Sequence, residues 1–144
     1  MYSVEGQYDL AIADFNKALE IDPMSAEAYN NRGITYSKKG QYDLAFADFT
    51  RALEIKPEDA EVYYNRGITY AMKGQFDLAL SDFKRSVEIR PINASTYEIM
   101  GIVHMEIACS DWKQACNFGN CDHLKEAVRV GLCAETNWNS TFSP

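Results

Sequence analysis

Several features are scarce in this 144-residue chain, and each scarcity excludes a class of protein. Only two histidines occur, and we find no hydrolase, zinc-protease, phosphate-loop or dinucleotide motif, so we expect no enzyme and no cofactor. No apolar run approaches the ~18 residues that a membrane-spanning helix needs. Positive charge is also in deficit, with 14 Lys+Arg against 21 Asp+Glu, which excludes a basic nucleic-acid-binding surface.

Cysteine is absent from the first 108 residues and is confined to Cys109, Cys116, Cys121 and Cys133. The spacing C-x6-C-x4-C-x11-C lacks the short pairs of structural zinc sites, so we expect no metal. Two interpretations stay open. The cysteines are either reduced and buried in a small terminal cap, or oxidised as Cys109–Cys133 and Cys116–Cys121 if a helix over 122–130 folds back. Disulfides would indicate an oxidising compartment.

The N-terminus, MYSVEGQYDL, has neither the basic region nor the apolar core of an export signal. This favours the cytoplasm. An exported or periplasmic location stays open if the cysteines are oxidised or if the chain is a piece of a longer protein.

A repeat of 34 residues organises most of the chain, since residues 7–40 and 41–74 are identical at 24 of 34 positions. Prolines, glycines and aromatics recur with the same period. They are Pro23, Pro57 and Pro91; Gly33, Gly67 and Gly101; Tyr29, Tyr63 and Tyr97; and Phe15, Phe49 and Phe83. Such self-similarity indicates a tandem array of one structural unit.

Each unit has the pattern of two helices. Ser25, Asp59 and Asn93 stand where the first helix needs an N-cap, and Gly40 and Gly74 stand where it ends. The second helix, such as residues 42–56, has apolar residues at helical spacing and ends before a proline. One helix pair cannot bury its apolar face alone, so we expect an all-α stack of pairs.

These residues resemble the tetratricopeptide repeat, whose pattern is an aromatic, a small residue, a tyrosine, then alanine, phenylalanine, alanine and proline. The matching residues are Tyr29, Gly33, Tyr36, Ala45, Phe49, Ala52 and Pro57, followed by Tyr63, Gly67, Tyr70, Ala79, Phe83, Ser86 and Pro91. The resemblance implies a right-handed α-α superhelix (a solenoid) of antiparallel helix pairs with a 34-residue period. Small residues such as Gly33 and Ala45 would let the helices of a pair cross closely.

We divide this single domain into a partial first repeat, two full repeats and a C-terminal cap. The expected bounds are 1–24 (mainly a second helix), 25–58, 59–92, 93–133 (a degenerate repeat with capping helices) and a tail over 134–144. Residues 1–6 would supply only the tail of a first helix that ends at Gly6, because Tyr2 and Gly6 take the places of Tyr36 and Gly40, so we expect a piece of a longer protein. The alternative is that a helix over 8–21 is the true start, which would leave one apolar flank bare for a partner or a second copy. The cysteine-bearing end (AC…FGNC…GLC) is similar to the ends of some bacterial members of the family.

In this family the first helix of each pair lines a concave groove that binds peptides, so the resemblance implies a groove in this chain too. The residues we expect in it are Asn30, Asn31, Ile34, Lys38, Tyr64, Asn65, Ile68, Met72, Glu98 and Ile102, with Glu27, Ser37 and Glu61 on the same face. Asn31 and Asn65 are similar to the family's peptide-holding asparagines, because an amide both donates to and accepts from a backbone. Simple duplication of the repeat would explain them equally well.

The main functional hypothesis is a scaffold that binds another protein or peptide in this groove. The family's carboxylate clamp would be incomplete, because Met72 stands where Lys38 would recur, which favours an internal or uncharged segment. Arg32 and Arg66 either serve that groove or form structural pairs with Asp43, Asp48, Asp77 or Asp82. The alternative is self-assembly through an exposed N-terminal flank formed by Leu10, Ile12, Phe15 and Leu19.

Overall fold

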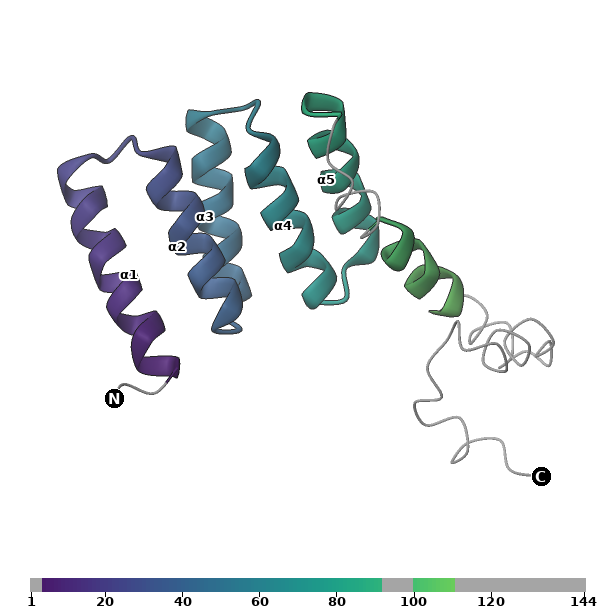
Figure 1. The fold of residues 1–144 in the computed structure, drawn as a ribbon, viewed down its shortest axis with the longest axis horizontal. Helices are drawn as coiled ribbons and strands as arrows, with labels where there is room; N and C mark the ends of the chain where they lie inside the picture. Colours follow the sequence, from purple (N-terminus) through teal and green to yellow (C-terminus); the bar gives the residue numbers. More distant parts are fainter. Residues whose placement is uncertain (1–3, 92–99, 111–144) are drawn as a thin grey trace, which may run out of the picture. The chain divides into compact units, whose positions relative to one another are not determined.

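In the computed structural model, residues 4–91 and 100–110 are described, and the secondary structure within these two ranges is helical. The first compact unit, Met1–Tyr97, holds α1 (Val4–Ile21), α2 (Ala26–Lys38), α3 (Tyr42–Ile55), α4 (Ala60–Met72) and α5 (Phe76–Ile89). Figure 1 shows these helices side by side in chain order, with a short turn reversing the chain between one helix and the next from α1 to α5. The helix over residues 100–110 belongs to a second unit, Glu98–Pro144.

The helix ends follow from local chemistry. Ser25 caps α2 by accepting a hydrogen bond from the Ala28 amide at 3.2 Å, and Asp59 caps α4 by accepting from the Glu61 and Val62 amides. Gly40 and Gly74 have φ values of 76° and 77°, so they reverse the chain in a backbone region that other residues rarely adopt. These predicted ends are confirmed for α2 and α4, whereas Asn93 lies outside the described residues.

Within each pair, a glycine on the first helix leaves room for a phenylalanine ring of the second helix. The pairs are α2 with α3 and α4 with α5, which have the most extensive contacts in the unit. A Cβ atom on Gly33 would lie 2.8 Å from Cε1 of Phe49, and one on Gly67 would lie 2.6 Å from Cε1 of Phe83. Both rings are fully buried. The predicted close crossing is therefore confirmed, and the group that fills it is the phenylalanine ring.

Side chains of successive pairs also pack together in the core. Phe49 and Val62 belong to one buried cluster with three alanines, and the rings of Phe46 and Tyr70 stack at 4.3 Å between centroids.

Within the pair of α4 and α5, Ser86 stands where the family pattern has alanine, and its hydroxyl donates to the carbonyl of Ala60 at 2.8 Å. This hydrogen bond offsets the burial of a polar group at that position.

One expectation about the N-terminus is wrong. Gly6 takes the place of Gly40 in the repeat, but it lies inside α1, which already begins at Val4. α1 runs as one continuous helix through this glycine to Ile21.

Most of the predicted cap lies outside the described residues. Val103 and Cys109 are buried in the helix over residues 100–110, and Cys109 is disulfide-bonded. Cys116, Cys121 and Cys133, and with them both predicted pairings, fall outside the described residues. The expected helix over 122–130 and the tail over 134–144 do so as well.

Candidate functional site

The first helices of the two complete pairs, α2 and α4, lie side by side and are joined by three hydrogen bonds between side chains, one of which runs from the Ser37 hydroxyl to the sulfur of Met72 at 3.7 Å. The Asn65 amide nitrogen donates to Oδ1 of Asn30 at 3.2 Å, and the Thr69 hydroxyl donates to Oγ of Ser37 at 2.9 Å. These links hold the two helices in a fixed register. We call the surface that they form the α2–α4 face.

One end of the α2–α4 face contains a mainly apolar hollow of about 380 Å³, which we call the apolar hollow. Its lining residues are Ile34, Ser37, Lys38, Tyr64, Asn65, Ile68, Thr69 and Met72. Ile34, Ile68 and Met72 supply the aliphatic surface, and Lys38 carries the only charge. Met72 is 52% exposed, so apolar surface is open to solvent there.

The other end of the face, near the N-termini of α2 and α4, contains a polar hollow of about 240 Å³ that we call the acidic hollow. Its lining residues are Ala26, Glu27, Asn30, Asn31, Lys56, Asp59 and Glu61. Lys56 pairs with Asp59 at 3.5 Å, whereas Glu27 and Glu61 have no charged partner in the described part of the chain. The acidic hollow is therefore negative overall.

The three predicted asparagines are not equivalent. Asn30 is only 5% exposed, and its Oδ1 accepts the hydrogen bond from Asn65. Asn31 lies in the acidic hollow, where its side chain makes no hydrogen bond to a described group. Asn65 lines the counterpart of that hollow one repeat later, a hollow of about 300 Å³ beside Arg90, and it also lines the apolar hollow. The repeated asparagines Asn31 and Asn65 therefore line equivalent hollows but differ in their contacts, because only Asn65 donates to the preceding repeat.

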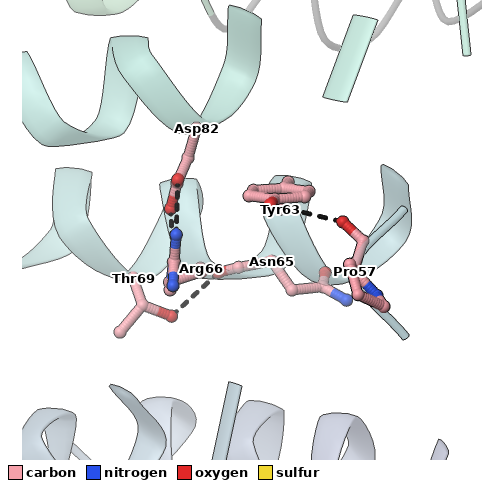
Figure 2. A network of polar contacts seen from close by, with 6 residues as sticks. All are labelled: Pro57, Tyr63, Asn65, Arg66, Thr69 and Asp82. Atoms are coloured by element: carbon pink, nitrogen blue, oxygen red, sulfur yellow. Dashed lines mark hydrogen bonds and ion pairs between the residues drawn. The ribbon is translucent and has the colours of Figure 1, made fainter. Parts of the chain in front are cut away.

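Behind the face, each repeat carries an arginine clamped to the second helix of its own pair. Figure 2 shows Arg66, which donates through Nε and Nη2 to the two carboxylate oxygens of Asp82 at 2.7 and 2.8 Å. Arg32 binds Asp48 in the same way, with two distances of 2.7 Å. Such bidentate pairs are among the strongest hydrogen-bonded contacts in proteins. The predicted pairing with Asp48 and Asp82 is confirmed, whereas Asp43 pairs with Lys73.

Aromatic rings enclose both guanidinium groups. Cζ of Arg66 lies 5.5 Å from the ring centroid of Tyr63 and 5.9 Å from that of Tyr70, and Arg32 has the same distances to Tyr29 and Tyr36. In the same neighbourhood the Tyr63 hydroxyl donates to the carbonyl of Pro57 at 3.4 Å, and the Thr69 hydroxyl donates to that of Asn65 (Figure 2). The motif N-R-G-I-T-Y is therefore largely a packing motif.

Electrostatics keep the two arginines charged. The hydrogen bonds that Arg32 donates to Asp48 raise the pKa of its guanidinium above the ordinary value, although burial acts in the opposite direction. Asp82 raises the pKa of Arg66 for the same reason. A folded-state pKa above the unfolded one gives stabilisation that is fully present below the unfolded pKa. Both guanidinium groups are therefore charged throughout the physiological range, and each is held by an aspartate of its own pair.

Eight of the ten residues expected in the groove line the hollows of the α2–α4 face. They are Asn30, Asn31, Ile34, Lys38, Tyr64, Asn65, Ile68 and Met72. Glu98 lies outside the described residues. Ile102 lies in the second unit, where it is 62% exposed.

The flank that we considered for self-assembly lies on α1. Leu10 is 48% exposed and Phe15 is half-buried, although Phe49 and Phe83 at the equivalent positions are fully buried. Leu19 of the same helix is buried. Self-assembly through this flank stays a prediction.

The described residues lack two other kinds of site. No helix among them is long and apolar enough to cross a membrane. No group of three or more His, Cys, Asp or Glu residues in the ranges 4–91 and 100–110 could hold a metal ion.

Comparisons with known proteins agree with the repeat pattern. A family model described as a TPR repeat matches residues 2–40, and one described as a tetratricopeptide repeat matches residues 24–92. No curated protein matches the chain in sequence.

Similar solved structures include three tetratricopeptide domains. The first such domain of Spaghetti (RPAP3), described as bound to the HSP90 peptide SRMEEVD, has a TM-score of 0.68 at 23% identity, covering 72% of this chain and 82% of its own. The first such domain of human RPAP3 has a TM-score of 0.70 at 22% identity, with 74% and 84% covered. The Arabidopsis OM64 domain has a TM-score of 0.64 at 21% identity, with 67% and 80% covered. At these identities the likeness concerns the fold.

Proposed function

The chain belongs to the tetratricopeptide repeat family, and we propose that it holds an extended, internal segment of a partner protein on its α2–α4 face. The family fold is an all-α solenoid that serves protein–protein interaction, which makes this molecule an interaction scaffold. Its surface therefore has to supply both affinity and selection for a partner.

The observation that carries the proposal is the apolar hollow at one end of the α2–α4 face together with the Asn31 amide at the other end. Ile34, Ile68 and Met72 present aliphatic surface to solvent at one end of the face, and such surface gains free energy when an apolar side chain covers it. The Asn31 amide, without a hydrogen-bond partner among the described residues, can both donate to and accept from a peptide backbone. An internal segment offers both an apolar side chain and backbone groups.

The magnitudes predict weak binding. One buried aliphatic side chain contributes about 2 kcal/mol, and two or three hydrogen bonds contribute about 1 kcal/mol each. The sum is roughly 5 kcal/mol, and the loss of freedom on association reduces it further, so these contacts alone give weak binding.

A charged C-terminal peptide suits this face poorly. The neighbouring structure of Spaghetti is described as bound to SRMEEVD, a peptide with several carboxylates. In this chain Lys38 is the only cation of the apolar hollow, Met72 stands at the equivalent position of the next repeat, and Arg32 is bound to Asp48. Glu27 and Glu61 would repel an acidic ligand at the other end of the face.

Two matched variants test whether the partner binds at the apolar hollow. Peptides selected from a random 12-residue display library would be titrated by fluorescence anisotropy against the native chain, Met72→Asp and Leu78→Asp. Met72 and Leu78 are 52% and 48% exposed, but Leu78 lies on α5 and lines neither hollow. We expect Met72→Asp to weaken binding at least tenfold and Leu78→Asp to leave it unchanged. Equal affinities for both variants would place the site elsewhere.

A further inference from the structure

We infer that the segment held on the α2–α4 face carries a lysine or arginine three positions from an aliphatic residue, in a polyproline II-like conformation. This inference rests on the proposed function and specifies its ligand. The basic side chain would enter the acidic hollow, and the aliphatic side chain would enter the apolar hollow.

The charge of the acidic hollow selects the basic residue. Glu27 and Glu61 are exposed, lie in the first turns of α2 and α4, and have no charged partner in the described part of the chain. Lys56, the one cation lining this hollow, is already paired with Asp59. Two unpaired carboxylates in one recess favour a cationic side chain from the ligand.

A buried donor in the same hollow points independently to a ligand. Asn30 is 5% exposed, and its Oδ1 accepts from Asn65, but its Nδ2 donates to no described group. Buried amide donors in folded proteins nearly always have an acceptor. Because Asn30 lines the acidic hollow, a backbone carbonyl of the ligand would supply that acceptor.

The distance between the two hollows sets the spacing in the ligand. Glu27 and Ile34 are seven positions apart on α2, as are Glu61 and Ile68 on α4, which corresponds to ~10.5 Å along a helix axis. Polyproline II has three residues per turn and rises ~3.1 Å per residue, so positions i and i+3 share one side ~9.3 Å apart. In a β-strand those two side chains would point to opposite faces.

A helical ligand would also span the distance, with side chains at i and i+7, but it fits the asparagines poorly. Its backbone groups are bonded within the helix and cannot satisfy Asn30 or Asn31. The amides of the face therefore select an extended ligand over a helical one.

Lys38 determines which end of the α2–α4 face can bind the basic side chain of the ligand. It is exposed at the apolar hollow and has no acidic partner in the described residues, so it repels a basic side chain there. The ligand's cation is consequently confined to the end with Glu27 and Glu61.

The test uses capped, labelled eight-residue peptides with the core Arg-Pro-Pro-Leu or its reverse, Leu-Pro-Pro-Arg, and matched peptides with Glu in place of Arg. They would be titrated against the native chain and Glu27→Lys/Glu61→Lys. The control is Glu5→Lys/Asp77→Lys, which changes the charge equally, also in first helical turns, but outside both hollows.

We expect one of the two arginine peptides to bind the native chain at least tenfold more tightly than its glutamate analogue. The preference should reverse in Glu27→Lys/Glu61→Lys and persist in the control variant. Equal binding of the arginine and glutamate peptides would overturn the inference. So would tighter binding of a stapled helix with arginine and leucine seven positions apart. If display-selected peptides still lose affinity with Met72→Asp in those cases, the proposed function stands and only the ligand class is wrong.

Discussion

Gly67 lies against the ring of Phe83 so closely that a Cβ atom at Gly67 would come within 2.6 Å of Cε1 of that ring. The ring is fully buried, so it has no free space into which it could move. We therefore predict that Gly67→Ala destabilises the chain by about 1–3 kcal/mol, the cost of overpacking a core. This loss would be measured as the difference in the free energy of unfolding between the native chain and the variant in urea.

Gly101 is the matched control for that substitution. It lies within the helix over residues 100–110, and nothing lies within 4 Å of a Cβ atom built there. We expect Gly101→Ala to leave stability unchanged or to raise it by up to about 1 kcal/mol, because alanine favours helix. A Gly67→Ala variant as stable as the native chain would contradict the close crossing of α4 and α5.

Neutralising Asp82, which binds Arg66, should lower the stability of the fold more than neutralising an exposed aspartate. Asp82→Asn removes the charge that Arg66 binds through two hydrogen bonds, and the Asp82 side chain is only 8% exposed. We expect a loss of up to about 3 kcal/mol, since the guanidinium is left partly buried without its counter-ion. Asp77→Asn, exposed in the first turn of the same helix, should cost about 0.5 kcal/mol. Thermal denaturation of both variants compares them, and equal losses would argue against a structural role of the pair.

Asn31 and Asn65 should respond differently to alanine. Asn65→Ala removes the donor to Asn30 and leaves a buried acceptor unpaired, so we expect a loss of about 1–2 kcal/mol. Asn31→Ala removes no hydrogen bond to a described group, so its free energy of unfolding should stay within about 0.5 kcal/mol of that of the native chain. Urea denaturation of both variants would show this, and similar losses would mean that the asparagines are equivalent after all. Binding studies should therefore use Asn31→Ala, which separates recognition from stability.

The helices and their ends were predictable because their causes are local. Ser25 and Asp59 cap helices with their own side chains, and Pro57 forces its neighbour out of the helical region. Glycine at the crossing was predictable as well, because the 34-residue pattern repeats Gly33 at Gly67. Gly6 was predicted wrongly, because the repeat pattern assigns it to the end of a helix and the structure places it inside α1.

The site was less predictable because it depends on how neighbouring repeats are offset. The repeat pattern equates Asn31 with Asn65, whereas the structure joins Asn65 to Asn30, 35 residues away. A usable signal was the small set of differences between two nearly identical repeats. Asn30 is replaced by Tyr64 and Lys38 by Met72, and all four residues line a hollow. Where a sequence is copied so closely, the positions that differ can mark the surface that recognises a ligand.

Methyl-group NMR tests the binding face most directly. The chain would be labelled at isoleucine, leucine and methionine methyls and titrated with a display-selected peptide. We predict shifts at Ile34, Ile68 and Met72, with Leu10 on α1 and Leu78 on α5 unchanged. Shifts at Leu10 or Leu78 without shifts in the apolar hollow would contradict binding on the α2–α4 face.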